Sequence, residues 1–227
     1  MSGTTHPLEP LDDARHRLRV RRRHLVDERD AFDQFCRRVE TLPTVEATDA
    51  PGSVLSMTAR TEPGPPALRA AYDGTVMTVP HAEEDDASVP AFDDLLPRPT
   101  RAEIRWAARL TPALQSAVLD AATTAHEHRV DRIEAIDAEL ATLDRTEAVA
   151  RDLLAVESST DEARLASLDR RCRRHAARRR ATLANRAETD APALPADLYT
   201  DIEVEDPVLS ALEAVRDRLP RDTEEAD

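Results

Sequence analysis

The feature that most constrains the fold of this chain is a seven-residue spacing of apolar side chains near its start. The residues at this spacing are Leu11, Leu18, Leu25, Phe32 and Val39, with Ala14, Phe35 and Leu42 at the companion positions. Such a seam predicts one long amphipathic helix over residues 11–42 that packs against another helix. Arg21 and Glu28 interrupt the companion positions, so the predicted partner is a helix with complementary charges.

Two further long helices are predicted in the second half. Thr111 and Pro112 supply an N-cap and a first-turn proline for a helix over 112–157. Its predicted stripe is Leu114, Val118, Ala121, Ala125, Ile133, Ile136, Leu140, Leu143, Ala150 and Leu154, with a heptad register from Ile133 onwards that is broken only at Glu147. Ser159 and Glu162 form a capping-box pattern before a helix over 161–187. So short a connection makes the two helices antiparallel neighbours.

The remaining segments complete the predicted domain organisation. Residues 1–10 are predicted to be a flexible N-terminus, 11–190 one helical-bundle or coiled-coil domain, 191–219 a C-terminal segment with a short helix, and 220–227 a disordered acidic tail. Inside the domain, 43–66 is predicted to be a proline-rich linker and 80–99 an acidic loop. Short helices are predicted over 67–79 and, from a capping box formed by Thr100 and Glu103, over 100–110.

The composition favours helices over sheets. The chain has four glycines and six aromatic residues and is rich in Ala, Leu, Glu and Arg. Because six rings are too few for a thick core, aliphatic seams are expected to supply most of the buried area. We therefore predict an all-α, elongated antiparallel helical bundle with coiled-coil character. The 112–157 and 161–187 helices form its central hairpin, with the 11–42 helix alongside.

The charge composition indicates the solution in which the protein works. All 31 basic residues are arginine, the 45 acidic residues exceed them, and the net charge is −14. An acid excess of this kind favours a cytoplasm at very high salt, where carboxylates keep a protein soluble. The start of the chain lacks an apolar signal core, no stretch approaches 18 apolar residues, and two cysteines are too few for a disulfide framework. We expect a cytoplasmic protein that does not contact membranes.

An arginine cluster, RRCRRHAARRR at 170–180, is the most conspicuous candidate site. On a helical wheel, only Arg179 falls within the apolar stripe of Leu165, Leu168, Cys172, Ala176 and Leu183. The others could bind phosphates through their planar guanidinium groups. The candidate nucleic-acid residues are Arg170, Arg171, Arg173, Arg174, Arg178 and Arg180, and a second basic stretch at 15–24 would widen the footprint.

The favoured alternative is a solvated helix face paired with acids of the preceding helix. The candidate acids are Asp131, Glu134, Asp137, Glu139 and Asp144. Six to ten phosphate contacts lose about 10³ to 10⁵ in affinity between 50 and 200 mM salt, so little would remain at molar salt. Residues 164–186 also contain no aromatic ring on which a base could stack.

Metal binding and catalysis have less support. Cys172 and His175, three residues apart on one helix face, could contribute two zinc ligands. No second ligand pair has the spacing of a zinc motif, and a free cysteine on an apolar stripe is usually a small buried hydrophobe. The chain contains no phosphate-binding loop, dinucleotide fingerprint or nucleophile elbow. We therefore expect a non-enzymatic protein without a cofactor.

Four segments together resemble a known family. They are VDERDAFDQFCRRVETLP (26–43), AAYDGTVMTVPHAEED (70–85), LTPALQSAVLDAA (110–122) and PVLSALEAVRDRL (207–219). In this order they resemble family 7260 of the domains of unknown function, a haloarchaeal family, over residues 10–219. The resemblance implies a helical, intracellular, high-salt protein and brings no activity, cofactor or catalytic residue.

These observations favour an uncharacterised, non-enzymatic protein of a halophile that acts through protein–protein contacts. Long amphipathic helices are suited to binding a partner helix or a second copy of the chain. The alternative is a nucleic-acid-associated or regulatory protein that uses the basic stretches 15–24 and 170–180.

Overall fold

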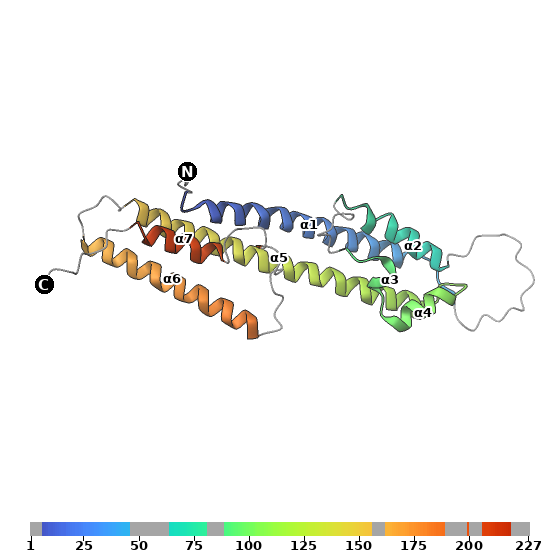
Figure 1. Ribbon diagram of the computed structural model, residues 1–227. Coiled ribbons are helices and arrows are strands. Elements are labelled where there is room, and N and C mark those ends of the chain that lie inside the picture. The colour runs from blue at the N-terminus through green and yellow to red at the C-terminus, as the bar shows by residue number, and fades with distance from the viewer. Residues whose placement is uncertain are drawn as a thin grey trace, which may run out of the picture. The chain divides into compact units, whose positions relative to one another are not determined.

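A computed structural model describes residues 6–45, 64–80, 89–155, 162–188, 199 and 206–218. Within these ranges every regular element is helical, which confirms the predicted all-α class (Figure 1). The elements are α1 (Glu9–Glu40), α2 (Pro65–Asp73), the 3₁₀-helix η1 (Val76–Thr78), α3 (Phe92–Leu95), α4 (Arg98–Trp106), α5 (Pro112–Leu154), α6 (Glu162–Glu188) and α7 (Pro207–Arg216). None of these helices combines the length and apolar character that a membrane span requires.

The chain divides into two compact units, and α1 and α5 contribute to both. Unit 1 joins Met1–Arg22 with Arg132–Asp227, and unit 2 is Arg23–Asp131. This division crosses the single domain that the sequence predicted over 11–190. The predicted capping box at Ser159, most of the 43–66 linker and the 220–227 tail lie outside the described residues.

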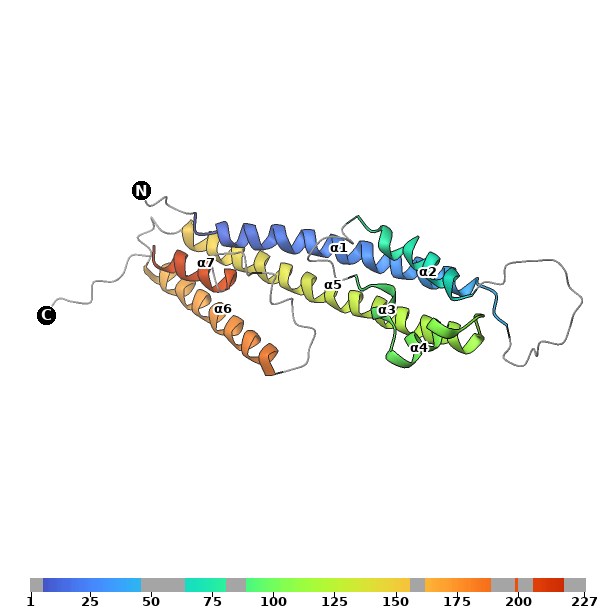
Figure 2. The same ribbon diagram turned by 45° about the vertical axis from the view of Figure 1, so that its right-hand side comes forward.

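In unit 1, α1 and α6 each run antiparallel to α5. Arg15, early in α1, binds Asp144 and Glu147 at 3.2 and 2.5 Å, whereas Arg22, one heptad later, binds Asp137 at 2.6 Å. Likewise α6 pairs with successively earlier residues of α5, and both views show α6 and α7 beside α5 (Figure 2). The predicted α5–α6 hairpin with the first helix alongside is therefore observed in unit 1.

The buried face of α5 in unit 1 differs from the predicted stripe by one residue at alternate positions. The fully buried residues are Ile136, Glu139, Leu143, Thr146, Ala150 and Leu153. The predicted stripe contained Leu140 where Glu139 is buried and Leu154 where Leu153 is buried. It also treated Glu147 as a break, whereas Thr146, one residue earlier, is buried in the seam. At Glu139 and Thr146 the prediction was wrong because it preferred apolar residues, whereas both find hydrogen-bond partners on α6. At the end of the stripe Leu153 is buried and Leu154 is half-buried, which continues the register of Glu139 and Thr146.

Unit 2 contains a cluster of aromatic rings that the composition did not predict. Phe35 and Tyr72 meet edge to face with centroids 5.2 Å apart, and Phe92 lies 5.3 Å from Tyr72. Phe32 completes the cluster at 6.2 Å from Tyr72. Edge-to-face contacts of this kind add to the burial of the rings themselves. Four of the six rings thus gather between α1, α2 and α3 rather than being spread along the seams.

Several predicted helix starts were too late. α2 begins at Pro65 and α4 at Arg98, with Pro97 at its N-cap, so Thr100 lies buried in the first turn instead of capping it. Proline is well suited to the first turn of a helix because its φ angle is already helical and its missing N–H has no partner there anyway. The predicted capping box at Thr100 and Glu103 was therefore wrong.

Two segments predicted to be irregular contain ordered helix. α1 starts at Glu9, inside the predicted flexible N-terminus 1–10, because Leu8 is buried and its carbonyl accepts from the Leu11 amide. α3 lies inside the predicted acidic loop 80–99, because Phe92 is buried in the ring cluster and carries this turn into the core. In both segments the burial of one apolar side chain allows a helix to form where the sequence predicted irregular structure.

Candidate functional site

The six arginines predicted to contact nucleic acid all lie exposed on α6. Three of them form ion pairs, in which Arg171 binds Asp152, Arg173 binds Asp169 and Arg180 binds Glu213. The other three, Arg170, Arg174 and Arg178, form no ion pair with another described residue. They are spaced four apart and follow one side of α6, and we call them the three-arginine ridge.

Two of the five acids predicted to neutralise this face pair with α1 instead. Asp137 and Asp144 bind Arg22 and Arg15 of α1, not arginines of α6. Of the predicted acids, Glu139 does pair with α6, through the buried Arg179. The second basic stretch, 15–24, is partly engaged in the same way: the side chain of Arg15 is only 11% exposed between Asp144 and Glu147.

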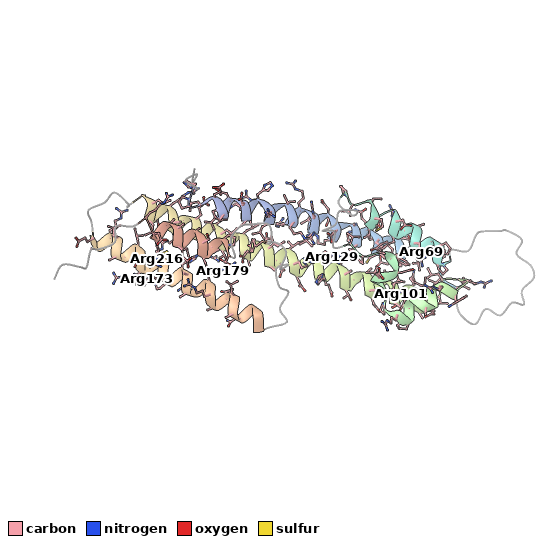
Figure 3. All side chains as sticks on the ribbon, viewed as in Figure 1. Arg69, Arg101, Arg129, Arg173, Arg179 and Arg216 are labelled. Carbon is pink, nitrogen blue, oxygen red and sulfur yellow. The ribbon has the colours of Figure 1, made fainter. Side chains whose placement is uncertain are left out.

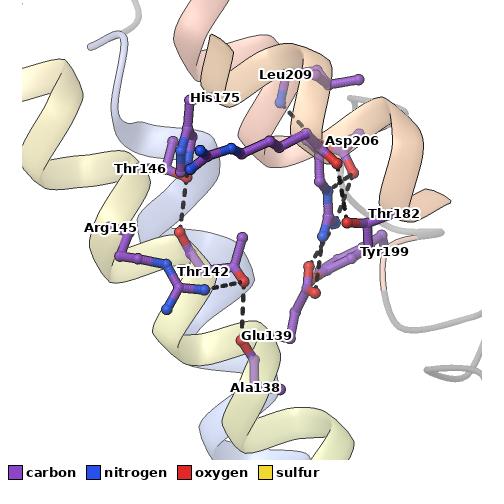
Figure 4. Close-up of polar contacts among 12 residues, drawn as sticks. Ala138, Glu139, Thr142, Arg145, Thr146, His175, Thr182, Tyr199, Asp206 and Leu209 are labelled. Carbon is purple, nitrogen blue, oxygen red and sulfur yellow. Dashed lines mark hydrogen bonds and ion pairs between the residues drawn. The ribbon is translucent and has the colours of Figure 1, made fainter. Parts of the chain in front are cut away.

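Arg179 lies at the centre of a buried polar cluster in unit 1, and the other members of the cluster, Glu139, Tyr199 and Asp206, are labelled in Figure 4. Its Nη1 and Nη2 donate to the two carboxylate oxygens of Glu139 on α5 at 2.9 and 2.6 Å. Its Nε donates to Asp206, the N-cap residue of α7, at 2.9 Å, and Tyr199 Oη donates to Glu139 at 3.1 Å. The guanidinium group thus joins α5, α6 and α7, and Tyr199 joins the group through Glu139. We call these four residues the Arg179 cluster.

The electrostatics of the Arg179 cluster hold the protons of Arg179 and Tyr199 in place. Burial alone lowers the pKa of Arg179, but the hydrogen bonds and negative charges of Glu139 and Asp206 raise the pKa overall. Burial, followed by the charge of Glu139, raises the pKa of Tyr199. Both groups therefore hold their protons throughout the physiological range. The cluster is suited to holding helices in register rather than to moving a proton.

Cys172 and His175 reach toward different helices. Cys172 is fully buried, its Sγ lies 3.8 Å from the Leu212 carbonyl of α7, and burial raises the pKa of its thiol to about 11. A cysteine ligates a metal as the thiolate, which this environment disfavours. His175 instead turns to α5, with Nε2 2.9 Å from Thr146 Oγ1.

The network around Thr146 assigns the proton of His175. Thr146 Oγ1 donates its single proton to the Thr142 carbonyl at 2.8 Å, so His175 Nε2 must be the donor to Thr146. Burial, together with the charges of Arg145 and Arg178, lowers the pKa of His175. Among the described residues, no group of three or more His, Cys, Asp or Glu side chains is arranged to hold a metal ion.

Unit 2 has its own buried ion pair. Glu28, which the sequence identified as a break in the α1 seam, is fully buried and accepts from Arg129 Nε of α5 at 3.0 Å. The guanidinium carbon of Arg129 lies 4.6 Å from the centroid of the Phe32 ring, a cation–π arrangement. Figure 3 shows Arg129 on α5. The predicted partner helix of complementary charge is therefore α5.

The sequence reasoning missed an exposed surface on α4. Trp106, the only tryptophan of the chain, has 84% of its surface exposed. Thr100 and Ile104 are buried, which turns the opposite side of this helix outward. The outward side carries Arg98, Ala102, Arg105 and Trp106, and we call it the Trp106 surface. The spacing of these residues in the sequence could have revealed it.

Comparison with known proteins identifies one family. A family model described as a domain of unknown function, DUF7260, matches residues 9–223. No curated protein and no solved structure matches the chain. The match covers both units, including the Arg179 cluster and the Trp106 surface.

Proposed function

Because the chain belongs to the DUF7260 family, whose function is undefined, we propose from its own surfaces that it is a non-enzymatic helical protein that binds a protein partner. The observation that carries this proposal is the exposure of Trp106 on the outward side of α4. Single exposed apolar residues are common, but tryptophan is the residue most enriched at interface hot spots. Arginine is also enriched at hot spots, and Arg105 directly precedes Trp106, with Arg98 two turns earlier on the same helix.

The use of the buried polar groups supports a structural rather than a catalytic role. The Arg179 cluster joins α5, α6 and α7, and the Glu28–Arg129 pair joins α1 and α5. Each of these buried charges is thus matched by an opposite charge on another element, as expected of groups that specify how helices fit together. A catalytic acid or base would instead need a pKa near the working pH and access to substrate.

The proposal is tested with matched variants used as bait. Wild-type protein, Trp106→Ala and Met77→Ala are immobilised and exposed to lysate at molar KCl, the salt that the acidic composition favours. Met77, at 37% exposure, is the matched control because it is also an exposed large apolar residue of unit 2. We expect a defined protein to be retained by wild type and Met77→Ala and lost with Trp106→Ala. Identical sets on all three baits would overturn the proposal.

A second candidate function is nucleic-acid binding through the three-arginine ridge. The observation that favours it is that Arg170, Arg174 and Arg178 form no ion pair with another described residue, although three neighbouring arginines do. Gel retardation that persists at molar salt and disappears in the Arg170→Gln/Arg174→Gln/Arg178→Gln variant would support it. The matched control neutralises Arg171, Arg173 and Arg180. Retardation confined to low salt reports nonspecific charge and counts against this function.

The high-salt cytoplasmic setting is part of the same proposal. It is supported by the excess of 45 acidic over 31 basic residues. Many of the acids repel one another at low ionic strength, and salt screens that repulsion. We expect the melting temperature to rise as KCl is increased to molar concentration. A melting temperature that does not depend on salt would remove the support for this setting.

A further inference from the structure

The Trp106 surface carries a positive charge that no residue in the described part of the chain neutralises through an ion pair. Arg69 and Arg101, which lie nearby in unit 2, are paired with Asp93 at 2.6 Å and Asp94 at 3.4 Å. Arg98 and Arg105, on the outward side of α4, are exposed and form no ion pair with another described residue. This local charge stands out in a chain whose net charge is −14.

The two arginines and the indole form a coherent binding surface. Arg98 and Arg105 are two helical turns apart on one side of α4, and Trp106 follows Arg105 directly. A guanidinium group matches a carboxylate through two parallel N–H donors. The indole adds a large apolar face and one N–H donor. The surface therefore combines an apolar anchor with two cationic contacts on a rigid element.

Resting on the proposed function, we propose that the Trp106 surface binds an acidic segment of a partner protein. An apolar side chain of that segment covers the indole, and carboxylates on the same side of the segment bind Arg98 and Arg105, which lie together beside the indole. Charge complementarity carries this choice, because a basic segment would place like charges against two arginines that form no ion pair with a described residue. The acidic chain as a whole would still tolerate such a partner at high salt, where long-range repulsion is screened.

The arrangement favours a short acidic peptide over a nucleic acid. Nonspecific nucleic-acid sites combine a positively charged groove that follows the backbone with several stacking rings. The described part of α4 offers one exposed ring, and Glu103, exposed on the neighbouring side, limits the positive charge to the two arginines. Two discrete cationic contacts beside one anchor match a few carboxylates around an apolar residue.

The test uses the fluorescence of Trp106 in the full-length protein, since no other tryptophan contributes. The probes are two synthetic peptides of equal length with one central phenylalanine, one rich in Asp and Glu and the other rich in Lys. We expect the acidic peptide to shift the emission to shorter wavelength, as the indole leaves water, and to bind at least about tenfold more tightly than the basic peptide. That preference should decrease as salt is raised but persist at molar KCl, and a preference confined to low salt would report nonspecific charge and overturn the inference.

A charge-reversed variant provides the decisive comparison. Arg98→Glu/Arg105→Glu should reverse the preference, whereas the control Arg170→Glu/Arg174→Glu, which makes the same charge change on α6, should leave it unchanged. Equal binding of the two peptides, no change in emission, or an unchanged preference in the charge-reversed variant would overturn the inference.

Other occupants of the surface are separate outcomes of the same experiment. An oligothymidylate that binds more tightly than the acidic peptide would assign the surface to nucleic acid. An emission shift that grows with protein concentration alone would assign it to a second copy of the chain. If neutralising the four acids at 83–86 shifts the Trp106 emission to longer wavelength, the chain's own acidic run occupies the surface. Each of these results overturns the inference.

The inference and the proposed function fail separately. A partner that is lost with Trp106→Ala but retained by Arg98→Glu/Arg105→Glu would leave the proposed function standing and overturn the acidic-segment inference. If the bait experiment fails but the acidic peptide binds tightly and in a Trp106-dependent way, the proposed function is overturned and the acidic-segment inference stands.

Discussion

Arg179 of α6 donates two hydrogen bonds to the carboxylate of Glu139 on α5, at 2.9 and 2.6 Å, and both side chains are almost completely buried. The pair occupies a position in the α5 seam where the heptad pattern would place an apolar residue. A polar group in such a seam is stable only when its partner is in register, so a shifted hairpin would leave two charges buried and unpaired. We infer that this pair helps to select one alignment of α5 and α6.

Arg179→Met is expected to destabilise the protein far more than Arg180→Met. Removing Arg179 leaves Glu139 and Asp206 buried without their cation, which costs about 3–5 kcal/mol of unfolding free energy. The Arg180–Glu213 pair is more than half exposed, and such pairs contribute about 0–1 kcal/mol. Denaturant unfolding of the two neighbouring variants measures the difference. Equal losses of unfolding free energy would show that the buried pair stabilises the protein no more than the exposed pair does.

Asp206 is expected to have two separable roles. Its Oδ1 caps α7 by accepting from the Leu209 amide, and its Oδ2 binds Arg179. Asp206→Asn keeps a cap acceptor but loses the charge, whereas Asp206→Ala loses both. Thr111→Ala, which removes only the cap of α5, should cost about 1 kcal/mol. Asp206→Ala should exceed that cost by about 1.5–3 kcal/mol, the usual value for a hydrogen bond to a charged group.

The thermal stabilities of these three variants provide the check. If Asp206→Ala costs no more than Thr111→Ala, the contact with Arg179 contributes nothing. If Asp206→Asn lowers the melting temperature as much as Asp206→Ala does, the cap contributes nothing to stability.

The stability of unit 1 is expected to fall in mild acid because of His175. The pKa of His175 is lowered in the fold by burial and by the surrounding arginines. The unfolded chain therefore takes up this proton first, so stability that is present above about pH 6.5 is lost as the pH falls below it. His175→Gln keeps an N–H donor for Thr146 but does not titrate, and it should flatten the decrease in melting temperature over this range. The same slope in both proteins would contradict the prediction.

Alkaline destabilisation is expected to depend on Cys172. Burial raises the pKa of this thiol from 9.0 to about 11. The folded state thus holds the proton longer than the unfolded chain, so stability present below about pH 9 is lost as the pH rises toward 11, by about 2–3 kcal/mol in total. Cys172→Ala should reduce the slope of stability against pH in this window. Cys36→Ala, at a half-buried position, is the comparison and should reduce it less.

The seam of α1 shows what periodicity can predict. Leu11, Leu18, Leu25, Phe32 and Val39 are all fully buried, as their spacing required. A long apolar repeat must lie against another helix whatever the details, because leaving it in water forfeits the free energy of burial. The all-α class, the long helices and the antiparallel hairpin therefore followed from the sequence.

The α5 seam shows where the same reasoning fails. Hydrophobicity selected Leu140 over Glu139 and treated Thr146 as outside the stripe, and both choices were wrong. A buried polar residue is recognised only by its partner, and the partners here, Arg179 and His175, are 40 and 29 residues away in the sequence. Arg179 did carry one local signal, since it was the single arginine that fell within the apolar stripe of its helix.

The helices of this protein are specified locally, because helix propensity and apolar periodicity act over a few turns of chain. Which charges are buried together and which stay exposed depends on how the helices pack. The Arg179 cluster forms because α5 and α7 converge on one guanidinium group of α6, and Trp106 is exposed because Thr100 and Ile104 turn α4 the other way. Pairing and exposure depend on where neighbouring elements lie in space, which no local pattern specifies.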